Sequence, residues 1–488
     1  MTTKIAASQE RGMEWREALR KSMKAKERTD ILRVHMNELD PEYRSHSGDE
    51  VNLGLNTEQA MTEAKRCLDC IEPTCMKGCP VQIDIPGFIK NIERGEHLEA
   101  AKVLKRTSAL PAVCGRVCPQ EKQCEAQCFY TIKLGKPAVG IGNLERFAAD
   151  FERESGQLSV PELAPSNGKK IAVIGSGPAG LSFAGDMAKL GYVVTVFEAL
   201  HEVGGVLKYG IPGFRLPNSI VDVEINILKK MGVEFITDFV IGRTASIEDL
   251  KSEGFLAFFA ASGAGLPNFM NISGENLINV LSSNEYLTRV NLMDAASPDS
   301  DTPVPFGKRV AIIGGGNTAM DSVRTAKRLG AERAMIVYRR SEEEMPARLE
   351  EVIHAKEEGI EFLTLHNPIE YAGDERGRVQ RMLLQKMELG EPDASGRRKP
   401  VEIKGATEWV DVDLVIVSVG VSPNPLIPSS VEGLEVSRWG TIVVNDDMQS
   451  AIPYIFAGGD IVRGGATVIL AMGDGRKAAA AMHDYLNK

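Results

Sequence analysis

The sequence lacks three features that would indicate a membrane-spanning, secreted or nucleic-acid-binding protein. No apolar run approaches the roughly 18 residues that a membrane-spanning helix requires. The first residues, MTTKIAASQERGMEWREALRK, have no apolar core of a secretory signal. Basic residues are not in excess, because the net charge is −10, and this argues against a general nucleic-acid binder. We therefore expect a cytoplasmic protein that binds neither membrane nor nucleic acid.

Cysteine is absent from the chain except for one short window. All eight cysteines lie between residues 67 and 128, in two compact groups of four. The groups are Cys67, Cys70, Cys75 and Cys79, then Cys114, Cys118, Cys124 and Cys128. Thiolates clustered this closely are typical iron–sulfur ligands, and the proline that follows one cysteine of each group resembles bacterial ferredoxins. The window therefore predicts iron–sulfur clusters and a role in electron transfer.

Two other uses of clustered cysteines fit the pattern less well. Disulfides suit small secreted domains, whereas this chain shows no secretory signal and is long enough to bury a core. Structural zinc usually takes two close ligand pairs separated by a dozen or more residues. Here each group is a single run, and neither contains a histidine. Both alternatives stay open, but the spacing favours iron–sulfur ligation.

Two segments repeat the strand–turn–helix–strand pattern of dinucleotide-binding units. In the first, the glycine turn permits a close approach of a pyrophosphate to the start of a helix. Glu198 ends the following strand, where a carboxylate can accept hydrogen bonds from ribose hydroxyls. The predicted turn residues are Gly175, Gly177, Pro178, Ala179 and Gly180.

The second unit replaces the ribose-binding carboxylate with two arginines, Arg339 and Arg340. A carboxylate would repel a 2′-phosphate, whereas guanidinium groups can bind it in a bidentate manner, so this unit predicts NADPH rather than NADH. The alternative is that both arginines only coat the surface, and we expect Arg324 and Arg328 on the helix to be solvated. The predicted turn residues are Gly314, Gly316, Asn317, Thr318 and Ala319.

The C-terminal segment resembles the closing part of the flavin domain in two-dinucleotide flavoproteins. A Gly-Gly-Asp sequence at residues 458–460 precedes a helix rich in alanine and glycine. The resemblance assigns FAD to the first unit and places Arg215 near the cofactor, with a surface salt bridge as the alternative. It implies further FAD-site residues at Gly204, Gly205, Leu207, Gly459 and Asp460.

The order of these features predicts an α/β protein. Two Rossmann-like dinucleotide-binding domains, one for FAD and an inserted one for NADPH, follow an α-helical iron–sulfur domain. That helical domain should contain a helical hairpin at residues 85–111 and a helix at 138–154. A β-hairpin is expected near residues 385–404. The expected boundaries are 1–165 for the helical domain, 166–300 and 426–488 for the two parts of the FAD domain, and 301–425 for the NADPH domain.

Over essentially the whole chain, the arrangement resembles the small subunit of bacterial NADPH glutamate synthase. The segments that carry the resemblance are CLDC, CMKGCPVQIDIPGFI, CGRVCPQEKQCEAQC, IGSGPAGL, GGGNTAMD, YRRSEEEMPAR and AGGD. The same module occurs in dihydropyrimidine dehydrogenase and in the large subunit of NADH-dependent ferredoxin:NADP oxidoreductase. These motifs identify the module but separate its members poorly.

The resemblance implies two [4Fe-4S] clusters whose ligands cross between the cysteine groups. One cluster would take Cys67, Cys70, Cys75 and Cys128. The other would take Cys79, Cys118 and Cys124 with Glu145 as its fourth ligand, which leaves Cys114 spare. Spacing alone would instead suggest four ligands from each group, with Glu145 as an ordinary surface carboxylate.

The resemblance also implies a function. NADPH would give a hydride to FAD, and single electrons would pass through the clusters to a large subunit. That subunit, with FMN and a glutaminase site, makes glutamate from glutamine and 2-oxoglutarate. Hydride transfer needs geometry rather than an acid or a nucleophile, so no catalytic residue is assigned.

Two other functions stay open. The first is the large subunit of an electron-bifurcating ferredoxin:NADP transhydrogenase, which pairs with a small flavoprotein and exchanges electrons with ferredoxin. The second is a non-catalytic electron-wiring scaffold. As a subunit of either glutamate synthase or the transhydrogenase, the chain would be part of a hetero-oligomer. The basic residues of segment 11–36 suggest a partner-docking arm or, because acidic residues are interspersed, a solvated helix face.

Overall fold

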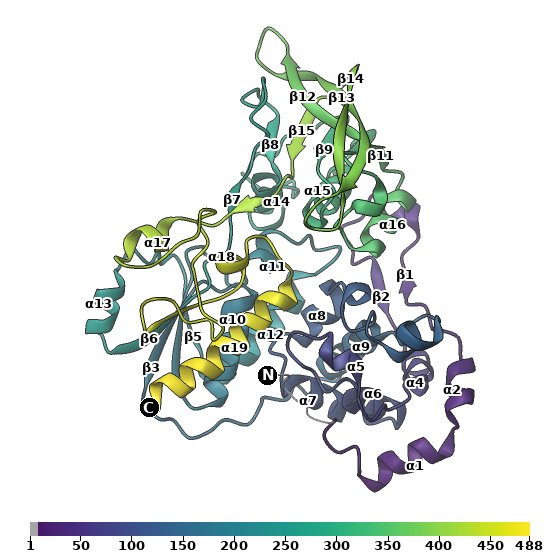
Figure 1. Cartoon of the computed structure of the whole chain (residues 1–488), viewed down its shortest axis with the longest axis vertical. Coiled ribbons are helices and arrows are strands. Elements are labelled where there is room, and N and C mark those ends of the chain that lie inside the picture. Colours follow the sequence, from purple (N-terminus) through teal and green to yellow (C-terminus); the bar gives the residue numbers. More distant parts are fainter. Residues whose placement is uncertain (1–7) are drawn as a thin grey trace.

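The computed structural model describes residues 8–488 and shows three lobes (Figure 1). A helical lobe formed by the N-terminal third lies beside one sheet-containing lobe, and a second sheet-containing lobe rises above both. The first seven residues of the predicted helical domain, and of the segment searched for a secretory signal, lie outside the described residues. Among residues 8–488, no helix has both the length and the apolar character needed to cross a bilayer.

The helical lobe contains the elements predicted around the cysteines. The pair α6 (Ile85–Glu93) and α7 (His97–Lys105) is the expected hairpin, and α9 (Ile141–Glu154) is the expected helix after the last cysteine. The Asp84 side chain caps α6 by accepting a hydrogen bond from the Gly87 amide. The other elements are α1 (Glu14–Ser22), α2 (Ala25–Asp30), β1 (Asn37–Glu38), α3 (Pro41–Arg44), β2 (Asn52–Gly54), α4 (Thr57–Lys65), α5 (Thr74–Lys77), α8 (Pro111–Val117), η1 (Gln120–Lys122) and η2 (Tyr130–Leu134).

The first sheet lobe has a five-stranded parallel sheet in the order β17-β6-β3-β4-β5. Because β17 comes from the C-terminal segment and pairs with β6, the chain returns to this sheet as predicted. The strands are β3 (Lys170–Ile174), β4 (Val193–Phe197), β5 (Glu234–Ile236), β6 (Phe255–Ala260) and β17 (Ile455–Ala457). The helices are α10 (Pro178–Lys189), α11 (Val206–Tyr209), α12 (Asn218–Lys230), α13 (Ile247–Ser252), α17 (Leu426–Ser430), α18 (Asp460–Arg463) and α19 (Val468–Leu486).

The second sheet lobe has a parallel sheet in the order β11-β10-β9-β15-β8 and an antiparallel meander, β12-β13-β14. The meander contains the predicted β-hairpin. The strands are β8 (Val280–Ser282), β9 (Arg309–Ile313), β10 (Arg333–Tyr338), β11 (Glu361–Thr364), β12 (His366–Gly373), β13 (Val379–Pro392), β14 (Arg398–Asp411) and β15 (Leu414–Val417). The helices are α14 (Ser283–Asn291), α15 (Asn317–Arg328), η3 (Glu342–Glu344) and α16 (Leu349–Glu357).

The second unit begins earlier than the predicted boundary at residue 300. Strand β8 pairs in parallel with β15, so residues 280–282 belong to the second sheet. The two connections between the sheet lobes pair with each other through β7 (Leu266–Pro267) and β16 (Val421–Ser422). The sequence pattern missed β8 because a three-residue strand shows no periodicity from which it could be identified.

The expectation that Arg324 and Arg328 are solvated is wrong. Arg324 is fully buried and pairs with Glu351 and Glu358, while Arg328 pairs with Glu358. Both guanidinium groups lie over the ring of Phe214, which comes from the first sheet lobe. This face of α15 is covered by another lobe, and helical periodicity alone cannot reveal such a neighbour.

Candidate cofactor-binding sites

Four cysteines from the two groups line one cavity in the helical lobe. They are Cys67, Cys70, Cys75 and Cys128, so three belong to the first group and one to the second. Apolar side chains of α6 and of the start of α9 form much of the remaining wall. We call this cavity the first sulfur pocket. The fold thus brings together the crosswise set that the family resemblance implies, rather than the four neighbouring cysteines that spacing suggested.

The first sulfur pocket is chemically suited to a metal cluster. All eight cysteines of the chain are free thiols. Burial raises the pKa of Cys67 to about 12, and the pKa of Cys75 rises through burial and through the neighbouring thiolates. Several buried thiolates cannot coexist without compensating positive charge, and iron supplies that charge. The donor set therefore fits an iron–sulfur cluster.

A second set, Cys79, Cys118, Cys124 and Glu145, lies close enough for its members' charges to interact, and we call this set the second sulfur pocket. Burial raises the pKa of Cys79 to about 12, and the charge of Glu145 adds to the rise. Glu145 is buried on α9, and its Oε1 atom has no hydrogen-bond partner. Burial, with a smaller effect of Glu224, raises the pKa of Glu145 to about 8. An unpartnered buried carboxyl beside three thiols fits a metal ligand and excludes an ordinary surface carboxylate.

Cys114 lies beside the second set, because the hydrogen-bonded Cys118 thiol, burial and the charge of Glu145 all raise its pKa. It lies fully buried on α8, and its thiol donates to the sulfur of Met472 on α19 at 3.5 Å. Cys114 therefore sits where the helical lobe meets the first sheet lobe. Gly473 lies in the same contact, because a Cβ atom there would be 3.0 Å from Cβ of Pro80.

The first glycine turn has the geometry of a pyrophosphate cradle. Gly175 has φ of +102°, and a Cβ atom there would be 2.6 Å from the Ala261 carbonyl oxygen. At Gly177 the Cβ direction is open, and Gly177 starts α10 without a side-chain cap. The first amides of α10, at Ala179 and Gly180, thus have no side-chain acceptor. Ser262 follows β6 by two residues, and its buried hydroxyl also lacks a hydrogen-bond partner.

The remaining predicted residues of this unit surround the turn. Glu198 is buried and accepts hydrogen bonds from the Ser176 amide and the Leu200 amide, each at 2.9 Å. A Cβ atom at Gly205 would be 2.9 Å from the Gly177 Cα, and one at Gly459 would be 3.0 Å from the Ala179 Cβ. The fold therefore gathers these distant segments around one turn. Leu207 and Asp460 also belong to these segments; Leu207 is fully buried, and burial raises the pKa of Asp460 to about 6.

Arg215 is held by two carboxylates. Its Nη1 atom lies 2.7 Å from Asp321 Oδ1, and its Nε atom lies 2.9 Å from Glu351 Oε1. Both carboxylates belong to the second sheet lobe, and all three side chains are buried. The surface salt bridge was wrong, because Arg215 forms a buried ion pair between lobes, and its place near the cofactor stays a prediction. Its partners lie more than a hundred residues away, and no local pattern could identify them.

The second glycine turn repeats the cradle. Gly314 has φ of +144°, and a Cβ atom there would be 2.3 Å from the Ser418 carbonyl oxygen. Gly316 faces open space and starts α15 without a side-chain cap. The Asn317 side chain accepts a hydrogen bond from the Arg348 amide at 2.8 Å. Thr318 is exposed and Ala319 is buried.

The two arginines after β10 have different surroundings. Arg339 is exposed. Arg340 is buried and donates to Asp393 and to the Arg398 carbonyl oxygen, each at 2.8 Å, so it is tied to the β13–β14 hairpin. Surface coating is therefore excluded for Arg340.

Sequence reasoning missed several residues that support these sites. The Asp474 carboxylate accepts from the Gly459 amide at 3.0 Å and pairs with Arg463, which holds the C-terminal glycine loop. The hydroxyl of Ser176 joins Glu198 to the Gly204 amide. Ser176 lies inside the glycine motif and could have been included from its position, whereas Asp474 carried no signal.

Comparison with known protein families divides the chain in the same way. Residues 44–157 match the family described as dihydropyrimidine dehydrogenase domain II, 4Fe-4S cluster. Residues 169–475 match the pyridine nucleotide-disulphide oxidoreductase family. Both matches cover the segments that carry the sulfur pockets and the glycine turns.

Curated relatives extend over most of the chain. The glutamate synthase [NADPH] small chain of Azospirillum brasilense is 36% identical over 443 residues, which cover 89% of this chain and 91% of the relative. The protein of the same description from Escherichia coli K12 is 37% identical over 436 residues, covering 88% and 92%. The NADP(+)-dependent formate dehydrogenase subunit beta of Moorella thermoacetica is 36% identical, covering 85% of this chain and 60% of the relative.

Solved structures share the fold of the two sheet lobes. FprA from Mycobacterium tuberculosis, in complex with NADPH, has a TM-score of 0.55 at 21% identity, covering 66% of this chain and 85% of FprA. Thioredoxin reductase from Lactococcus lactis has a TM-score of 0.50 at 22% identity, covering 65% of this chain and 99% of the reductase. At these identities the likeness concerns the fold alone.

Proposed function

The chain belongs to the family of the glutamate synthase [NADPH] small chain, and on this premise we propose that it is the NADPH-oxidising, electron-input subunit of a glutamate synthase. Its partner would be a large subunit with FMN and a glutaminase site that makes glutamate from glutamine and 2-oxoglutarate. The observation that carries the proposal is the presence of two dinucleotide cradles and two thiol-rich pockets in one chain. Such a chain can accept electrons in pairs and deliver them singly.

The residues of the chain have distinct roles in this proposal. When bound, FAD and the [4Fe-4S] clusters supply the conversion of a two-electron hydride transfer into one-electron steps. The uncapped start of α10 would bind the FAD pyrophosphate, and Glu198 would orient the ribose. The uncapped start of α15 would bind NADPH in the same way. Asp460, with Gly459, would approach the flavin from the C-terminal segment.

We assign the 2′-phosphate of NADPH chiefly to Arg339. This side chain is exposed after β10, whereas Arg340 already pairs with Asp393. Arg340 would then fix the hairpin beside the phosphate and add its positive charge at short range. Both arginines thus favour NADPH over NADH: Arg339 would contact the 2′-phosphate, and Arg340 would hold the neighbouring hairpin in place.

We also propose two clusters, held as the family resemblance implies. The first sulfur pocket would hold one through Cys67, Cys70, Cys75 and Cys128. The second would hold the other through Cys79, Cys118, Cys124 and Glu145. The support is the common cavity of the first set and the unpartnered buried carboxyl in the second.

A second candidate function changes only the partner. The formate dehydrogenase subunit of Moorella is also 36% identical to this chain, over 60% of its own length, which favours a module that serves several complexes. The ferredoxin-linked transhydrogenase, with a small flavoprotein partner, belongs to this class. An anaerobic pull-down of the chain from its native cell separates the two. A large FMN-containing partner with glutamine-dependent glutamate formation supports glutamate synthase, and a small flavoprotein partner overturns it.

The electron-input role is tested on the purified chain. Under anaerobic conditions, NADPH should bleach the absorbance of the bound flavin, and NADH should do so poorly. Arg339→Ala should raise the KM for NADPH by about tenfold, because one charge-assisted phosphate contact is lost. Arg376→Ala is the matched control, because Arg376 is also an exposed arginine and lies in the turn between β12 and β13. A flavin that NADPH leaves oxidised would instead support the non-catalytic scaffold.

A further inference from the structure

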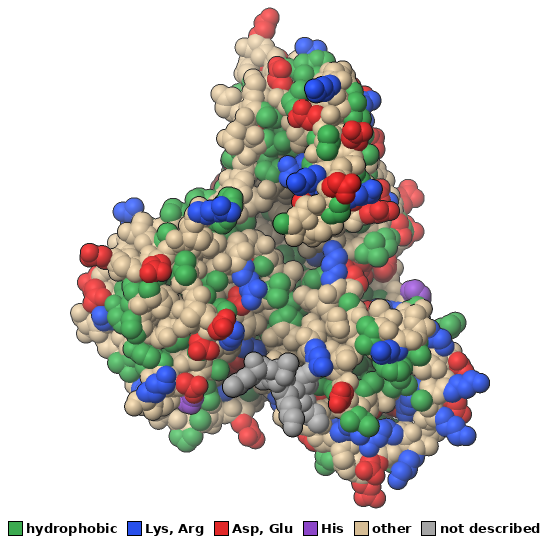
Figure 2. Space-filling view, viewed as in Figure 1, with side chains coloured by type: hydrophobic (Ala, Val, Ile, Leu, Met, Phe, Trp, Pro, Cys, Tyr) green, Lys and Arg blue, Asp and Glu red, His purple; other side chains and the backbone are tan. Residues whose placement is uncertain are grey.

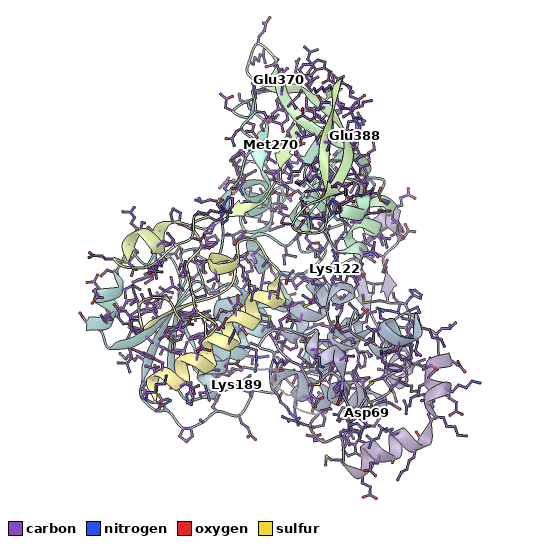
Figure 3. All side chains as sticks on the ribbon, in the orientation of Figure 1. Asp69, Lys122, Lys189, Met270, Glu370 and Glu388 are labelled. Carbon is purple, nitrogen blue, oxygen red and sulfur yellow. The ribbon has the colours of Figure 1, made fainter. Side chains whose placement is uncertain are left out.

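Three arginines of the N-terminal segment converge on one aspartate between two cysteines. We call residues 8–30 the N-terminal arm. Arg16 is fully buried and binds the Asp69 carboxylate through two nitrogens, at 2.6 Å and 3.0 Å. Arg20 binds the other side of that carboxylate at 2.6 Å, and Arg11 donates to the Asp69 carbonyl oxygen at 3.1 Å. Figure 3 shows Asp69 in the helical lobe beside α1.

The aspartate lies inside the loop that presents two thiols to the first sulfur pocket. Asp69 follows Cys67 by two residues and directly precedes Cys70. Its φ is +52°, a left-handed conformation that is uncommon outside glycine, although aspartate adopts it more readily than most residues. The three arginines restrain the loop from one side, and Lys90 donates to the Cys67 carbonyl oxygen from the other. The arm therefore fixes the loop conformation on which both thiols depend.

The arm is anchored at both ends of α6, which walls the same pocket. Near its start, the Ser8 hydroxyl donates to Asp84, the cap of α6. Near its end, Arg28 pairs with Glu93 of α6 at 2.9 Å. Tyr130, which lines the pocket, donates to the Arg28 carbonyl oxygen at 3.0 Å. The arm thus spans the pocket wall instead of extending into solvent.

The two expectations for this segment are therefore wrong for its central arginines. Arg16 and Arg28 are buried ion-pair partners, so they neither form a solvated face nor remain free to dock a partner. The exposed side of this region carries a mixture of acidic and basic side chains (Figure 2). The family match for the 4Fe-4S domain begins at residue 44, so the arm lies outside it.

We propose that the N-terminal arm is a built-in clasp of the first sulfur pocket. Through Asp69, Arg16 positions Cys67 and Cys70, and so determines how firmly this pocket retains its cluster. This inference rests on the proposed presence of that cluster. Arg16 is a positioning residue, because it acts through Asp69 and not by touching iron. Arg16 and Arg20 together also leave one positive charge in excess over Asp69, which favours an anionic cluster.

The test compares Arg16→Gln with a matched surface variant in the full-length, iron-loaded chain. Lys21→Gln is the control, because the Lys21 side chain is 80% exposed on the same helix. Iron release to a ferrous chelator is followed under argon, with FAD content as a measure of folding. In Arg16→Gln we expect the iron of the first sulfur pocket, about half of the total, to be released at least tenfold faster than in the wild type. The FAD content should be unchanged. Lys21→Gln should release iron at the wild-type rate.

Two further variants separate positioning from simple structural damage. Arg16→Lys should lie between wild type and Arg16→Gln, because an ammonium group cannot reproduce the bidentate pair. Arg16→Gln combined with Asp69→Asn should recover part of the retention, because it removes the unpaired buried carboxylate. If Arg16→Gln is insoluble, Arg20→Gln carries the same prediction with a smaller effect, since Arg20 is partly exposed.

The contrary outcome is equally defined. Wild-type iron release from Arg16→Gln, in a chain that keeps FAD and is still reduced by NADPH, overturns the clasp and leaves the proposed function intact. A wild-type chain that binds FAD but contains no iron overturns both the clasp and the proposed electron route.

Discussion

The two sulfur pockets use similar residues but have different surroundings. In the first, Cys70 and Cys75 are half-buried, and Ile71 beside them is 73% exposed. In the second, Cys79, Cys118 and Glu145 are buried and Cys124 alone is half-buried, and Glu145 is close enough to Glu224 of α12 for their charges to interact. The first pocket thus opens more toward the surface, whereas the second lies against the first sheet lobe. We expect electrons to enter at the second pocket and to leave from the first.

This difference also concerns what holds each pocket in place. The first is restrained by the N-terminal arm, a segment of its own lobe. The second is restrained by another lobe, through the contact of Cys114 with Met472 and through α12. Substitutions in the N-terminal arm should therefore affect the first sulfur pocket, whereas substitutions at the lobe interface should affect the second.

The largest effect is expected when a thiol of one pocket is removed. Cys70→Ser and Cys118→Ser should each lose about half of the iron of the wild type, because in the proposed arrangement each of the two clusters has its own ligand set. FAD content should be unchanged in both. Iron and sulfide analysis, with electron paramagnetic resonance of the reduced chain, measures the loss. If Cys70→Ser loses all iron, the two pockets are not independent, and if it loses none, Cys70 is not a ligand.

A smaller effect is expected when the carboxylate of the second pocket is changed. Glu145→Ala should lose iron from that pocket, whereas Glu145→Gln should retain more of it, because the amide oxygen can still donate to iron. Cys114→Ala should keep its iron, since the proposed ligand set leaves this thiol spare and it donates to Met472. The opposite pattern, with iron lost in Cys114→Ala and kept in Glu145→Ala, would make Cys114 the eighth ligand.

The smallest effect concerns the pH dependence of the iron-free chain. Burial raises the pKa of Glu145 from 4.5 to about 8, so the folded state favours its protonated form. The stabilisation is complete below about pH 4.5 and is lost as the pH rises toward 8. The free energy of unfolding should therefore fall by on the order of a few kcal/mol across this range. Urea unfolding at several pH values should show a weaker dependence in Glu145→Gln, and parallel curves for the two chains would contradict this.

Local patterns were sufficient for the elements that form the two nucleotide cradles. The glycine turns, the strands before them and the returning C-terminal strand were predicted correctly, because each is encoded within a few neighbouring residues. The same reasoning failed for Arg215, Arg324 and the start of the second sheet unit. Each of those depends on a partner supplied by a distant part of the chain.

The sulfur sites show the same division. The sequence by itself determined that eight thiols would lie close together, and their residue types indicated iron–sulfur chemistry. Only the tertiary structure decided that Cys128 joins Cys67, Cys70 and Cys75 in one cavity, and that Arg16 closes on the loop between them. The physical reason is that ligand sets and buried ion pairs depend on distances in space, and chain spacing fixes such distances only within a single turn or helix.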